Sequence, residues 1–313
     1  MPLPADDRNA QSHGRDDLQA ALASCATAVE RELETHLDDP GDTSKRLVQA
    51  MRHAALDGGK RVRPFLVIES ARIFDQTGAV PLRVAAALEC IHCYSLVHDD
   101  LPAMDDDKLR RGKPTVWAAY DEWTAILAGD ALLTLAFDMV SDPALPLANS
   151  AKLNIIRSLS RASGWRGMVG GQAIDLEADK LDKPADPDEA HIRHLQSLKT
   201  GALLVFGATA GARIADADAD ALAALDAYGR AIGLAFQIAD DLLDAEGDAA
   251  TMGKAVGKDA DAGKATLVGL LGRERARQEL NAAHEQAISH LAPFGARADR
   301  LRALAGFIVS RKH

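Results

Sequence analysis

Two acidic segments contain the residues of this chain that are best suited to do chemistry. The first, Asp99 to Asp107, contains five carboxylates and follows an apolar run of helical pattern. The second, Asp240 to Asp244, adds three carboxylates about 140 residues later, after another apolar run. Mg²⁺ prefers oxygen ligands and is typically held by one or two carboxylates together with substrate phosphates. The pattern therefore predicts divalent cations that bind a polyphosphate.

Clusters of cations accompany the acidic segments. Gly58 to Pro64 reads GGKRVRP and places three cations directly after two glycines, which free the backbone. A second cationic run, Lys108 to Lys113, follows the first acidic segment. Arginine can present a bidentate fork to phosphate, whereas the alternative at either place is a solvated basic turn. The adjacency of opposite charges favours phosphate binding, because a metal–phosphate complex needs both signs close together.

A long apolar helix over Val80 to Val97 is predicted to position the first acidic segment. One face of this helix carries, at helical spacings, Leu88, His92, Ser95 and Asp99. A lone histidine on a helix is more often structural, but its alignment with Asp99 favours a functional role for His92. Pro102 cannot continue the helix. We therefore expect a bulge after Asp99 that lets Asp99 and Asp105 converge.

A second apolar helix is predicted over Ala221 to Leu243, ending at the second acidic segment. One face of it carries Gly233, Gln237, Asp240, Asp241 and Asp244. Like charges at this spacing destabilise a helix by about 0.2–0.5 kcal/mol per pair. Opposite unit charges roughly 4 Å apart gain about 4 kcal/mol at an effective dielectric of about 20. Cation binding outweighs the repulsion, which again predicts a metal.

The bulk composition favours one large helical domain. The chain has 313 residues, a formal charge of −10, 47% hydrophobic residues and only 4% aromatic residues. Alanine and leucine lead the helix propensity scale, whereas aromatic residues favour strands. No linker-like stretch divides the chain, so we expect a polar, flexible N-terminus over 1–17 and a single domain over 18–313. The negative charge argues against a general nucleic-acid binder.

The N-terminus and the cysteines place the protein in the cytoplasm. Residues 1–17 lack the apolar core of a secretory signal. The longest uncharged run, 200–212, is too short for a membrane-spanning helix, which needs about 20 residues. Cys25, Cys90 and Cys93 do not form a disulfide framework. The C-x-x-C at 90–93 is interpreted as a pair of small core residues, with a zinc or redox site as the alternative.

The order of the motifs resembles the trans-isoprenyl (polyprenyl) diphosphate synthase family over nearly the whole chain. The motifs are GGKRVRP at 58–64, HDDLPAMDDDKLRRGKPT at 98–115, GGQAIDL at 170–176, KTG at 199–201, FQIADDLLD at 236–244, GK at 253–254 and GKAT at 263–266. One acidic motif alone would be weak evidence for this family, but two acidic motifs with the basic segments between them are specific evidence. The resemblance implies an all-α fold of long antiparallel helices around a deep central cavity, in a homodimer. It also implies Mg²⁺-dependent head-to-tail condensation of an allylic diphosphate with isopentenyl diphosphate.

The resemblance also implies roles for individual residues. About three Mg²⁺ ions, replaceable by Mn²⁺, would be held by Asp99, Asp105, Asp240 and Asp244. Isopentenyl diphosphate would be bound by Gly59, Lys60, Arg63, His92 and Arg111. The allylic diphosphate would be bound by Arg110, Lys199, Lys254 and Lys264. The developing carbocation would face Thr200, Gln237 and Gln172.

Two residues before the first acidic motif bear on the length of the product. Tyr94 and Ser95 lie about 6–7.5 Å deeper along the helix than Asp99, where a growing tail would descend. A bulky tyrosine there resembles bacterial farnesyl diphosphate synthases and predicts a fifteen-carbon product. The alternative is a geranylgeranyl or geranyl product. More remote alternatives are a class I terpene cyclase and a non-catalytic prenyltransferase subunit; no nucleic acid and no membrane insertion are expected.

Overall fold

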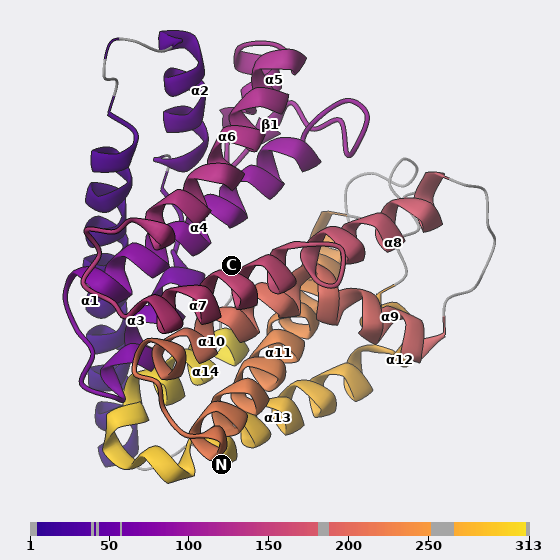
Figure 1. The fold of residues 1–313 in the computed structure, drawn as a ribbon. Helices are drawn as coiled ribbons and strands as arrows, with labels where there is room; N and C mark the ends of the chain where they lie inside the picture. Colours follow the sequence, from indigo (N-terminus) through magenta and orange to yellow (C-terminus); the bar gives the residue numbers. More distant parts are fainter. Residues whose placement is uncertain are drawn as a thin grey trace. The chain divides into compact units, whose positions relative to one another are not determined.

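The computed structural model describes residues 5–38, 41, 44–56, 58–180, 188–251 and 266–310. Apart from one short hairpin, the regular structure of these residues is helical, so the predicted all-α fold is confirmed (Figure 1). The chain divides into two compact units. Unit 1 comprises Met1–Leu159 and Ala210–Asp218, and unit 2 comprises Ser160–Thr209 and Ala219–His313. Each unit is described by itself, and the single domain expected over 18–313 stays a prediction.

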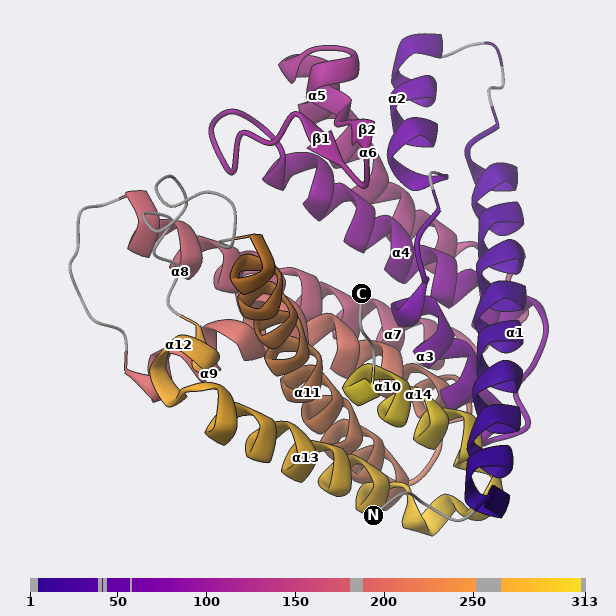
Figure 2. The ribbon, with the colours of Figure 1, turned by 180° about the vertical axis from the view of Figure 1, so that it is seen from behind.

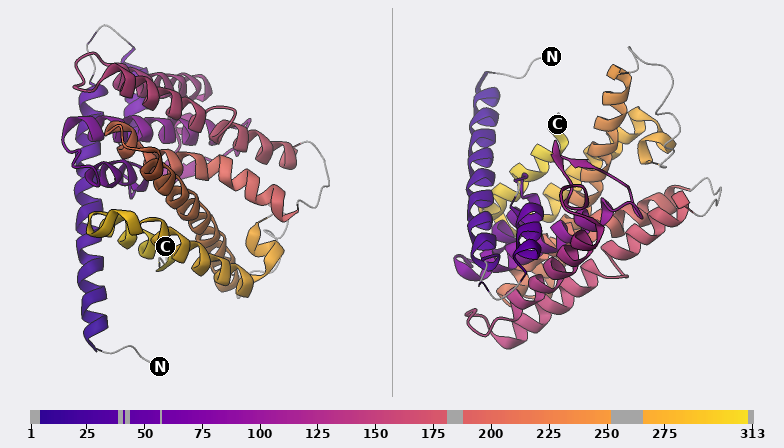
Figure 3. Two further views of the ribbon diagram at one scale, coloured as in Figure 1. Left: turned by 60° about the horizontal axis from the view of Figure 1, so that its bottom comes forward. Right: turned by 90° about the horizontal axis from the view of Figure 1, so that it is seen from above.

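Unit 1 is built around helix α4. Its elements are α1 (Ala5–His36), α2 (Lys45–Ala55), α3 (Val62–Arg72), α4 (Ala79–Asp99), β1 (Leu109–Arg110), β2 (Lys113–Pro114), α5 (Val116–Ala119), α6 (Glu122–Ser141) and most of α7 (Asn149–Ser163). Helix α4 packs against α6, α3 and α1. It is buried on successive positions from Val84 to Ile91, as expected for a helix that is apolar all round. Figure 3 shows α1 as one continuous helix; it starts well before residue 17.

Unit 2 is built around helix α11. Its elements are α8 (Met168–Lys180), α9 (Glu189–Gln196), the π-helical turn η1 (Ser197–Gly201), most of α10 (Ala202–Ile214), α11 (Ala219–Thr251), α12 (Leu267–Leu271), α13 (Arg273–His290), the 3₁₀ segment η2 (Ala292–Ala298) and α14 (Asp299–Ser310). Helix α11 packs against α13, α14 and η1 (Figure 2). Its buried Tyr228 hydroxyl donates to the Leu301 carbonyl at 2.8 Å, which fixes α14 on α11.

Two helix boundaries differ from those that the sequence predicted. Helix α11 does not end at the second acidic segment but continues to Thr251, because a repulsion of a few tenths of a kcal/mol per pair cannot stop a helix that is packed along its length. The sequence also indicates a helix that starts around residues 186–189 and ends at Lys199–Gly201, but the chain does not leave the helix there. It passes through the π-helical turn directly into α10.

The starts of three helices also need correction. The sequence suggests Pro64 as the first residue of a helix, but α3 begins at Val62 after Arg61. A proline is still tolerated at position 64 because the first helical turn lacks intrahelical N–H partners. Ser44 caps α2, and Asp188 caps α9 by accepting from the His191 N–H at 2.8 Å. The residues that the sequence favoured as caps, Thr43 and Asp186, lie outside the described residues.

Helices α4 and α6 are long and apolar enough to cross a membrane by length and composition alone. In this structure they pack against each other, and 67% of the apolar stretch of α4 and 44% of that of α6 is buried inside the protein. The core helices of soluble proteins pass the same test. The two helices are therefore weak evidence for a membrane segment.

Candidate active site

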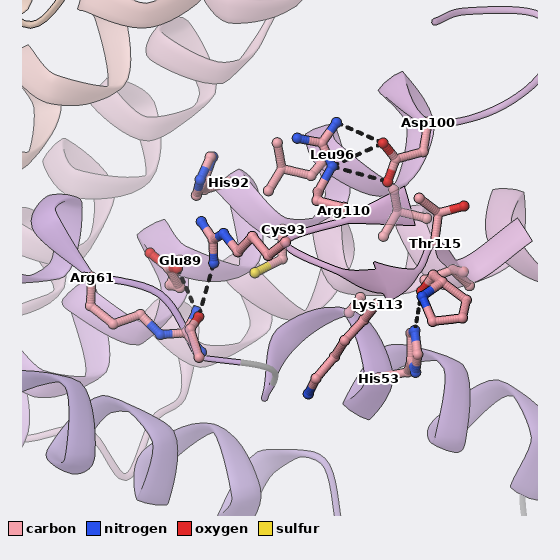
Figure 4. Close-up of a pocket in the computed structure, with 16 residues that line it drawn as sticks. His53, Arg61, Glu89, His92, Cys93, Leu96, Asp100, Arg110, Lys113 and Thr115 are labelled. Atoms are coloured by element: carbon pink, nitrogen blue, oxygen red, sulfur yellow. Dashed lines mark hydrogen bonds and ion pairs between the residues drawn. The ribbon is translucent and has the colours of Figure 1, made fainter. Parts of the chain in front are cut away.

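A basic pocket lies in unit 1 between the end of α2, the GGKRVRP segment, α4 and the hairpin (Figure 4). Its cationic or titratable lining residues are His53, Arg61, His92, Arg110, Arg111 and Lys113. Its acidic lining residues are Glu89 and Asp100. Each of the two carboxylates forms an ion pair with an arginine of the same pocket. The remaining positive charge suits an anion with several charged oxygens, such as a diphosphate.

Left-handed backbone brings the two basic segments together. Gly58 and Gly59 have φ values of 81° and 114°, and a Cβ on Gly59 would collide with the Arg111 guanidinium. Arg111 donates to the Gly58 carbonyl at 3.1 Å. In the hairpin, Arg111 and Gly112 both have positive φ between the paired strands β1 and β2, as in a tight two-residue turn. The φ of Gly59 would strain any residue with a side chain, and Arg111 would have to move away from such a side chain.

His92 is a neutral ring among guanidinium groups. It lies on α4, and Arg63 Nη1 approaches its Nε2 at 3.4 Å. Burial, together with the charges of Arg63 and Arg111, holds the pKa of His92 well below its usual 6.5. A guanidinium can only donate, so Nε2 acts as the acceptor and the ring proton is on Nδ1. The structure thus brings together Gly59, Arg63, His92 and Arg111, while Lys60 lies exposed on the same segment.

Asp100 is tied to Arg110 and not open to solvent. Arg110 Nη2 and Nε donate to Asp100 Oδ1 at 2.6 and 2.9 Å, and Nε also reaches Oδ2 at 3.2 Å. The Asp100 residue is only 3% exposed. Burial raises the pKa of Asp100, and Arg110 opposes that rise. The fork fixes the direction in which Arg110 leaves the hairpin, which the sequence alone did not reveal.

The chain turns sharply after Asp99, as predicted from Pro102. The Asp105 N–H donates to the Asp99 carbonyl at 2.9 Å, and the N–H groups of Met104 and Asp106 both donate to the Leu101 carbonyl. The backbones of Asp99 and Asp105 therefore meet, although six positions separate them. Asp99 is half-buried and Asp105 is exposed. The turn leaves these two carboxylates more open than Asp100.

Tyr94 is buried one turn and a half before Asp99. It is 5% exposed and contacts the His98 ring edge-on, with 5.8 Å between the ring centroids. His98 Nε2 donates to the Ile126 carbonyl of α6 at 3.1 Å, and its ring fills the space that a side chain at Gly129 would need. Ser95 Oγ donates to the His92 carbonyl at 2.9 Å. Tyr94 is thus held by a packed neighbour, as a fixed cavity wall requires.

Lys199 lies in the π-helical turn of unit 2. Its Nζ donates to Asp175 Oδ2 of α8 at 2.5 Å. A Cβ on Gly171 would overlap the Lys199 backbone, so the glycine-rich start of α8 permits this close approach. π-Helical turns are often found at functional sites. The carboxylate of Asp175, for which the sequence offered no role, holds the Lys199 ammonium in place.

Gln172 is a buried amide that finds no partner among the described residues. It is 9% exposed, and both its Nε2 and its Oε1 lack a hydrogen bond there. A buried amide without partners costs free energy, so such a group in a native protein calls for an explanation. Thr200, in the turn next to Lys199, and Gln237, on α11, are half-buried. The site predictions for these three residues stay predictions.

The second acidic segment lies within α11. Asp240 is half-buried and Asp244 is exposed. Asp241 accepts a hydrogen bond from Gln196 Nε2 at 3.2 Å and another from the Leu267 backbone N–H. Burial raises the pKa of Asp241 to about 6, and those two hydrogen bonds oppose the rise. Asp241 therefore connects α11 to the end of α9 and the start of α12.

The carboxylates fit a metal that also binds substrate oxygens. Among the described residues, no group of three or more His, Cys, Asp or Glu side chains is close enough to form a site made by protein alone. Mg²⁺ usually needs only one or two carboxylates, with waters and phosphates completing its shell. Asp99 with Asp105, and Asp240 with Asp244, are half-buried or exposed carboxylates of this kind within each unit. Lys254 and Lys264, the remaining predicted phosphate ligands, lie outside the described residues.

The cysteines behave as core residues. Cys25, Cys90 and Cys93 are free and buried. Burial raises the pKa of the Cys25 and Cys93 thiols to about 12. A thiol in that range is neither a good metal ligand nor a reactive nucleophile at neutral pH. The interpretation of the C-x-x-C as part of the core agrees with these contacts.

Comparison with known proteins adds independent information. The chain matches the family model of polyprenyl synthetases over residues 44–296. It is similar to the farnesyl diphosphate synthase of Escherichia coli, with 43% identity over 94% of this chain and 99% of that protein. It is also similar to a chloroplastic geranylgeranyl pyrophosphate synthase of Catharanthus roseus, with 36% identity over 94% of this chain and 82% of that protein. Among solved structures, an FPP/GFPP synthase from Zymomonas mobilis matches with a TM-score of 0.86 and 46% identity, over 95% of this chain and 100% of that one.

Proposed function

Because the chain belongs to the polyprenyl synthetase family, we propose that it is a farnesyl diphosphate synthase. It condenses dimethylallyl and then geranyl diphosphate with isopentenyl diphosphate, head to tail. The observation that carries the proposal is the near full-length similarity to bacterial farnesyl diphosphate synthases. The family resemblance found from the motifs is thereby confirmed, and the protein is a prenyltransferase.

The allylic diphosphate is activated by removing charge from its leaving group. In the first step the C–O bond of the allylic substrate breaks, and diphosphate departs with the electron pair. Mg²⁺ ions bound by Asp99, Asp105, Asp240 and Asp244 would neutralise charge on those phosphate oxygens. Arg110, which pairs with Asp100, and Lys199, which pairs with Asp175, would each supply positive charge to the leaving diphosphate. Because both cations are already oriented, little reorganisation accompanies the reaction.

The second substrate binds to the basic pocket of unit 1. Lys60, Arg63 and Arg111 would bind the diphosphate of isopentenyl diphosphate, with Gly59 keeping Arg111 close. His92 is neutral before binding and would gain a proton more readily once a diphosphate offsets the surrounding arginines. The isopentenyl double bond then attacks the allylic cation and forms the new carbon–carbon bond. The resulting cation loses a proton, for which the departed diphosphate is the acceptor.

The carbocation needs polar groups that do not attack it. The amides of Gln172 and Gln237 and the hydroxyl of Thr200 are proposed to face it through their oxygen atoms. The unpartnered buried amide of Gln172 supports this role, because a developing cation would give its oxygen a partner. Apolar helices around such a site exclude water, which would otherwise trap the cation as an alcohol.

Tyr94 is proposed to set the product length. Its ring is buried and supported by His98, so a tail that reaches it cannot easily displace it. The fifteen-carbon product is the reading that the relatives favour. The alternative is a geranylgeranyl product, because relatives of that activity are also similar over most of the chain.

A homodimer in the cytoplasm is the expected form of the enzyme. An exposed apolar patch on α6 supports association: Trp123, Ile126 and Leu127 are 57%, 45% and 47% exposed and recur at helical spacings. Large exposed apolar side chains grouped on one face commonly mark an interface. Size measurement in solution tests this expectation.

A product assay tests the proposed function. The protein is incubated with Mg²⁺, labelled isopentenyl diphosphate and dimethylallyl diphosphate, and the dephosphorylated alcohols are separated by chain length. Farnesol as the main product is the expected result, and no product should form when a chelator removes Mg²⁺. Geranylgeraniol would contradict the role of Tyr94 while keeping the reaction. A cyclic hydrocarbon, or no condensation by folded protein, would contradict the synthase assignment.

A further inference from the structure

Arg61 differs from the other cations of the GGKRVRP segment. Its residue is 4% exposed, whereas Lys60 is exposed and Arg63 is half-buried. Its backbone is left-handed, with φ 46° and ψ 40°, immediately before the first residue of α3. A residue with a side chain seldom adopts this conformation unless other contacts hold it there. A phosphate ligand is expected to be accessible to solvent before the substrate binds, and a buried arginine in such a backbone conformation is not.

The side chain of Arg61 is held by three other elements of unit 1. Its Nη1 pairs with Glu89 Oε1 of α4 at 2.5 Å, and Glu89 itself is 4% exposed. Its Nη2 donates to the Ala55 carbonyl at the end of α2 at 2.6 Å and approaches Glu30 Oε1 of α1 at 3.5 Å. Figure 4 shows Arg61 and Glu89 at one end of the pocket and Arg110 and Asp100 at the other.

We propose that the buried Arg61–Glu89 pair positions the isopentenyl diphosphate subsite without touching the substrate, an inference that rests on the proposed function. Arg61 lies directly after Lys60 and two residues before Arg63, so fixing its guanidinium fixes where both neighbours emerge. Glu89 lies three residues before His92 on α4, one helical turn away on the same side. The pair thereby joins the phosphate-binding segment to the helical turn that carries His92.

A second arginine pair in the same unit separates positioning from stability. Arg83, also on α4, pairs with Glu32 of α1 and, at 3.1 Å, with Asp142. This pair joins α1 directly to α4 through an arginine whose side chain is 18% exposed, whereas the Arg61 side chain is 2% exposed. Arg83 does not line the pocket. A purely structural role would make the two pairs equivalent in their effect on catalysis.

The experiment compares three variants with the unaltered protein. Replacing both partners, Arg61→Met with Glu89→Met, removes the ion pair without leaving a buried charge, and such replacements are often neutral for stability. Arg61→Lys keeps the charge but loses the fork that joins Glu89 to the Ala55 carbonyl. Arg83→Met is the matched control. For each, the melting temperature, the KM for each diphosphate and the calorimetric affinity for isopentenyl diphosphate are measured.

We expect the double variant to raise the KM for isopentenyl diphosphate by about tenfold or more, the loss expected when one charge-assisted phosphate contact is misdirected. The KM for the allylic diphosphate should stay within about twofold, since Arg110 is held by Asp100. Arg61→Lys should show the same selectivity to a smaller degree, and it carries the test if the double variant does not fold. Arg83→Met should change neither KM.

Unchanged KM values in a folded double variant, or an equal rise for both substrates, would overturn the inference. A selective rise in Arg83→Met as large as in the double variant would overturn it too. If the unaltered protein did not condense the substrates, the proposed function would fail by itself. Calorimetric binding of isopentenyl diphosphate would still decide the inference, because it needs no turnover.

Discussion

The two acidic segments share one design and differ in what holds it. Each segment contains two adjacent aspartates, Asp99–Asp100 and Asp240–Asp241. The second of the two is hydrogen-bonded to the protein: Asp100 to Arg110, and Asp241 to Gln196 and the Leu267 N–H. In each, the first aspartate is half-buried and the last is exposed. Adjacent carboxylates on a helix point in different directions. One carboxylate of each adjacent pair, Asp100 or Asp241, therefore anchors its segment while the other carboxylate points in a different direction.

The partners of the two anchors differ in charge. Asp100 pairs with Arg110, which we propose as a ligand of the allylic diphosphate, so the first segment would hold a phosphate ligand next to its carboxylates. Asp241 is bonded by neutral donors and ties α11 to the start of α12. The same sequence pattern thus serves two purposes. Under the proposed function the first segment orients the charge of Arg110, whereas the second fixes the position of a helix.

Removing a predicted metal ligand from either segment should have the largest effect. Asp99→Asn and Asp240→Asn should each lower kcat by about 10³-fold or more, because each weakens neutralisation of the leaving diphosphate. The Mg²⁺ concentration for half-maximal rate should rise in both. Asp138→Asn, an exposed change on α6, should leave both values unchanged. A variant at Asp99 or Asp240 with ordinary Mg²⁺ dependence would exclude that residue as a ligand.

Double-mutant cycles should separate the two anchors. Asp100→Asn with Arg110→Gln should give a coupling free energy of about 1–2 kcal/mol in urea unfolding, reduced by solvent because the Arg110 side chain is 35% exposed. Asp241→Asn with Gln196→Ala should give about 0.5–1 kcal/mol, as for a hydrogen bond with a neutral donor. Equal coupling energies would show that the charge of Arg110 does not distinguish the anchors.

Much of the site could be predicted because its signals are local. The carboxylates, glycines and cations occur in short motifs, and Pro102 predicts the turn that brings Asp99 to Asp105. Helical periodicity placed His92 on the face of Asp99. The long apolar stretches predicted an all-helical fold because alanine and leucine favour helices and the chain has few residues that favour strands.

The partners of these residues could not be predicted, because they come from distant parts of the chain. Arg61 was counted only as one of three cations in GGKRVRP and received no role of its own, since nothing in the segment shows that its side chain turns inward to Glu89. Asp175 and Gln196 become meaningful only when α8 and α9 pack beside Lys199 and Asp241. The end of α11 was misplaced because packing against α13, and not local repulsion, decides how far it runs.

The anchor Asp241 should make the stability of the protein depend on pH. In metal-free protein, the raised pKa of Asp241, about 6 against 3.8 when unfolded, makes its ionisation costly for the folded state. The free-energy cost of ionising Asp241 in the folded state is absent below about pH 4 and reaches its full value above about pH 6. Asp241→Asn should therefore stabilise the protein by about 2 kcal/mol at pH 7.5 and by little at pH 4. A stability gain that did not depend on pH would contradict this assignment.

His92 in unit 1 should show the opposite sign. Its pKa is lowered on folding, so the unfolded chain binds the proton more readily. The ring is neutral in both states above its unfolded pKa of 6.5, and the fold is destabilised as the pH falls below that value because only the unfolded chain takes up the proton readily. When the pH is lowered from 7.5 to 5.5, the free energy of unfolding measured in urea should thus fall less for His92→Gln than for the unaltered protein. Parallel pH profiles for the two proteins would show that His92 is not buried as a neutral ring.

The smallest effect on rate, and the clearest on product, is expected at Tyr94. Tyr94 lies five residues before Asp99, and Ala235 lies five residues before Asp240, so the two helices differ at equivalent positions. Tyr94→Ala removes a buried ring and gives α4 the same residue, alanine, that α11 has at the equivalent position. The condensation rate should stay within about threefold, because roughly 7.5 Å of helix separates this position from the acidic pair.

The products of the Tyr94 variant decide whether only α4 limits the length of the tail. Products longer than fifteen carbons should dominate with Tyr94→Ala, separated as alcohols by chain length. Tyr94→Phe is the matched control and should retain farnesol, because it keeps the ring that contacts His98. If Tyr94→Ala still stopped at farnesol, another side chain would have to close the cavity. The difference between tyrosine and alanine at the two equivalent positions would then have no bearing on specificity.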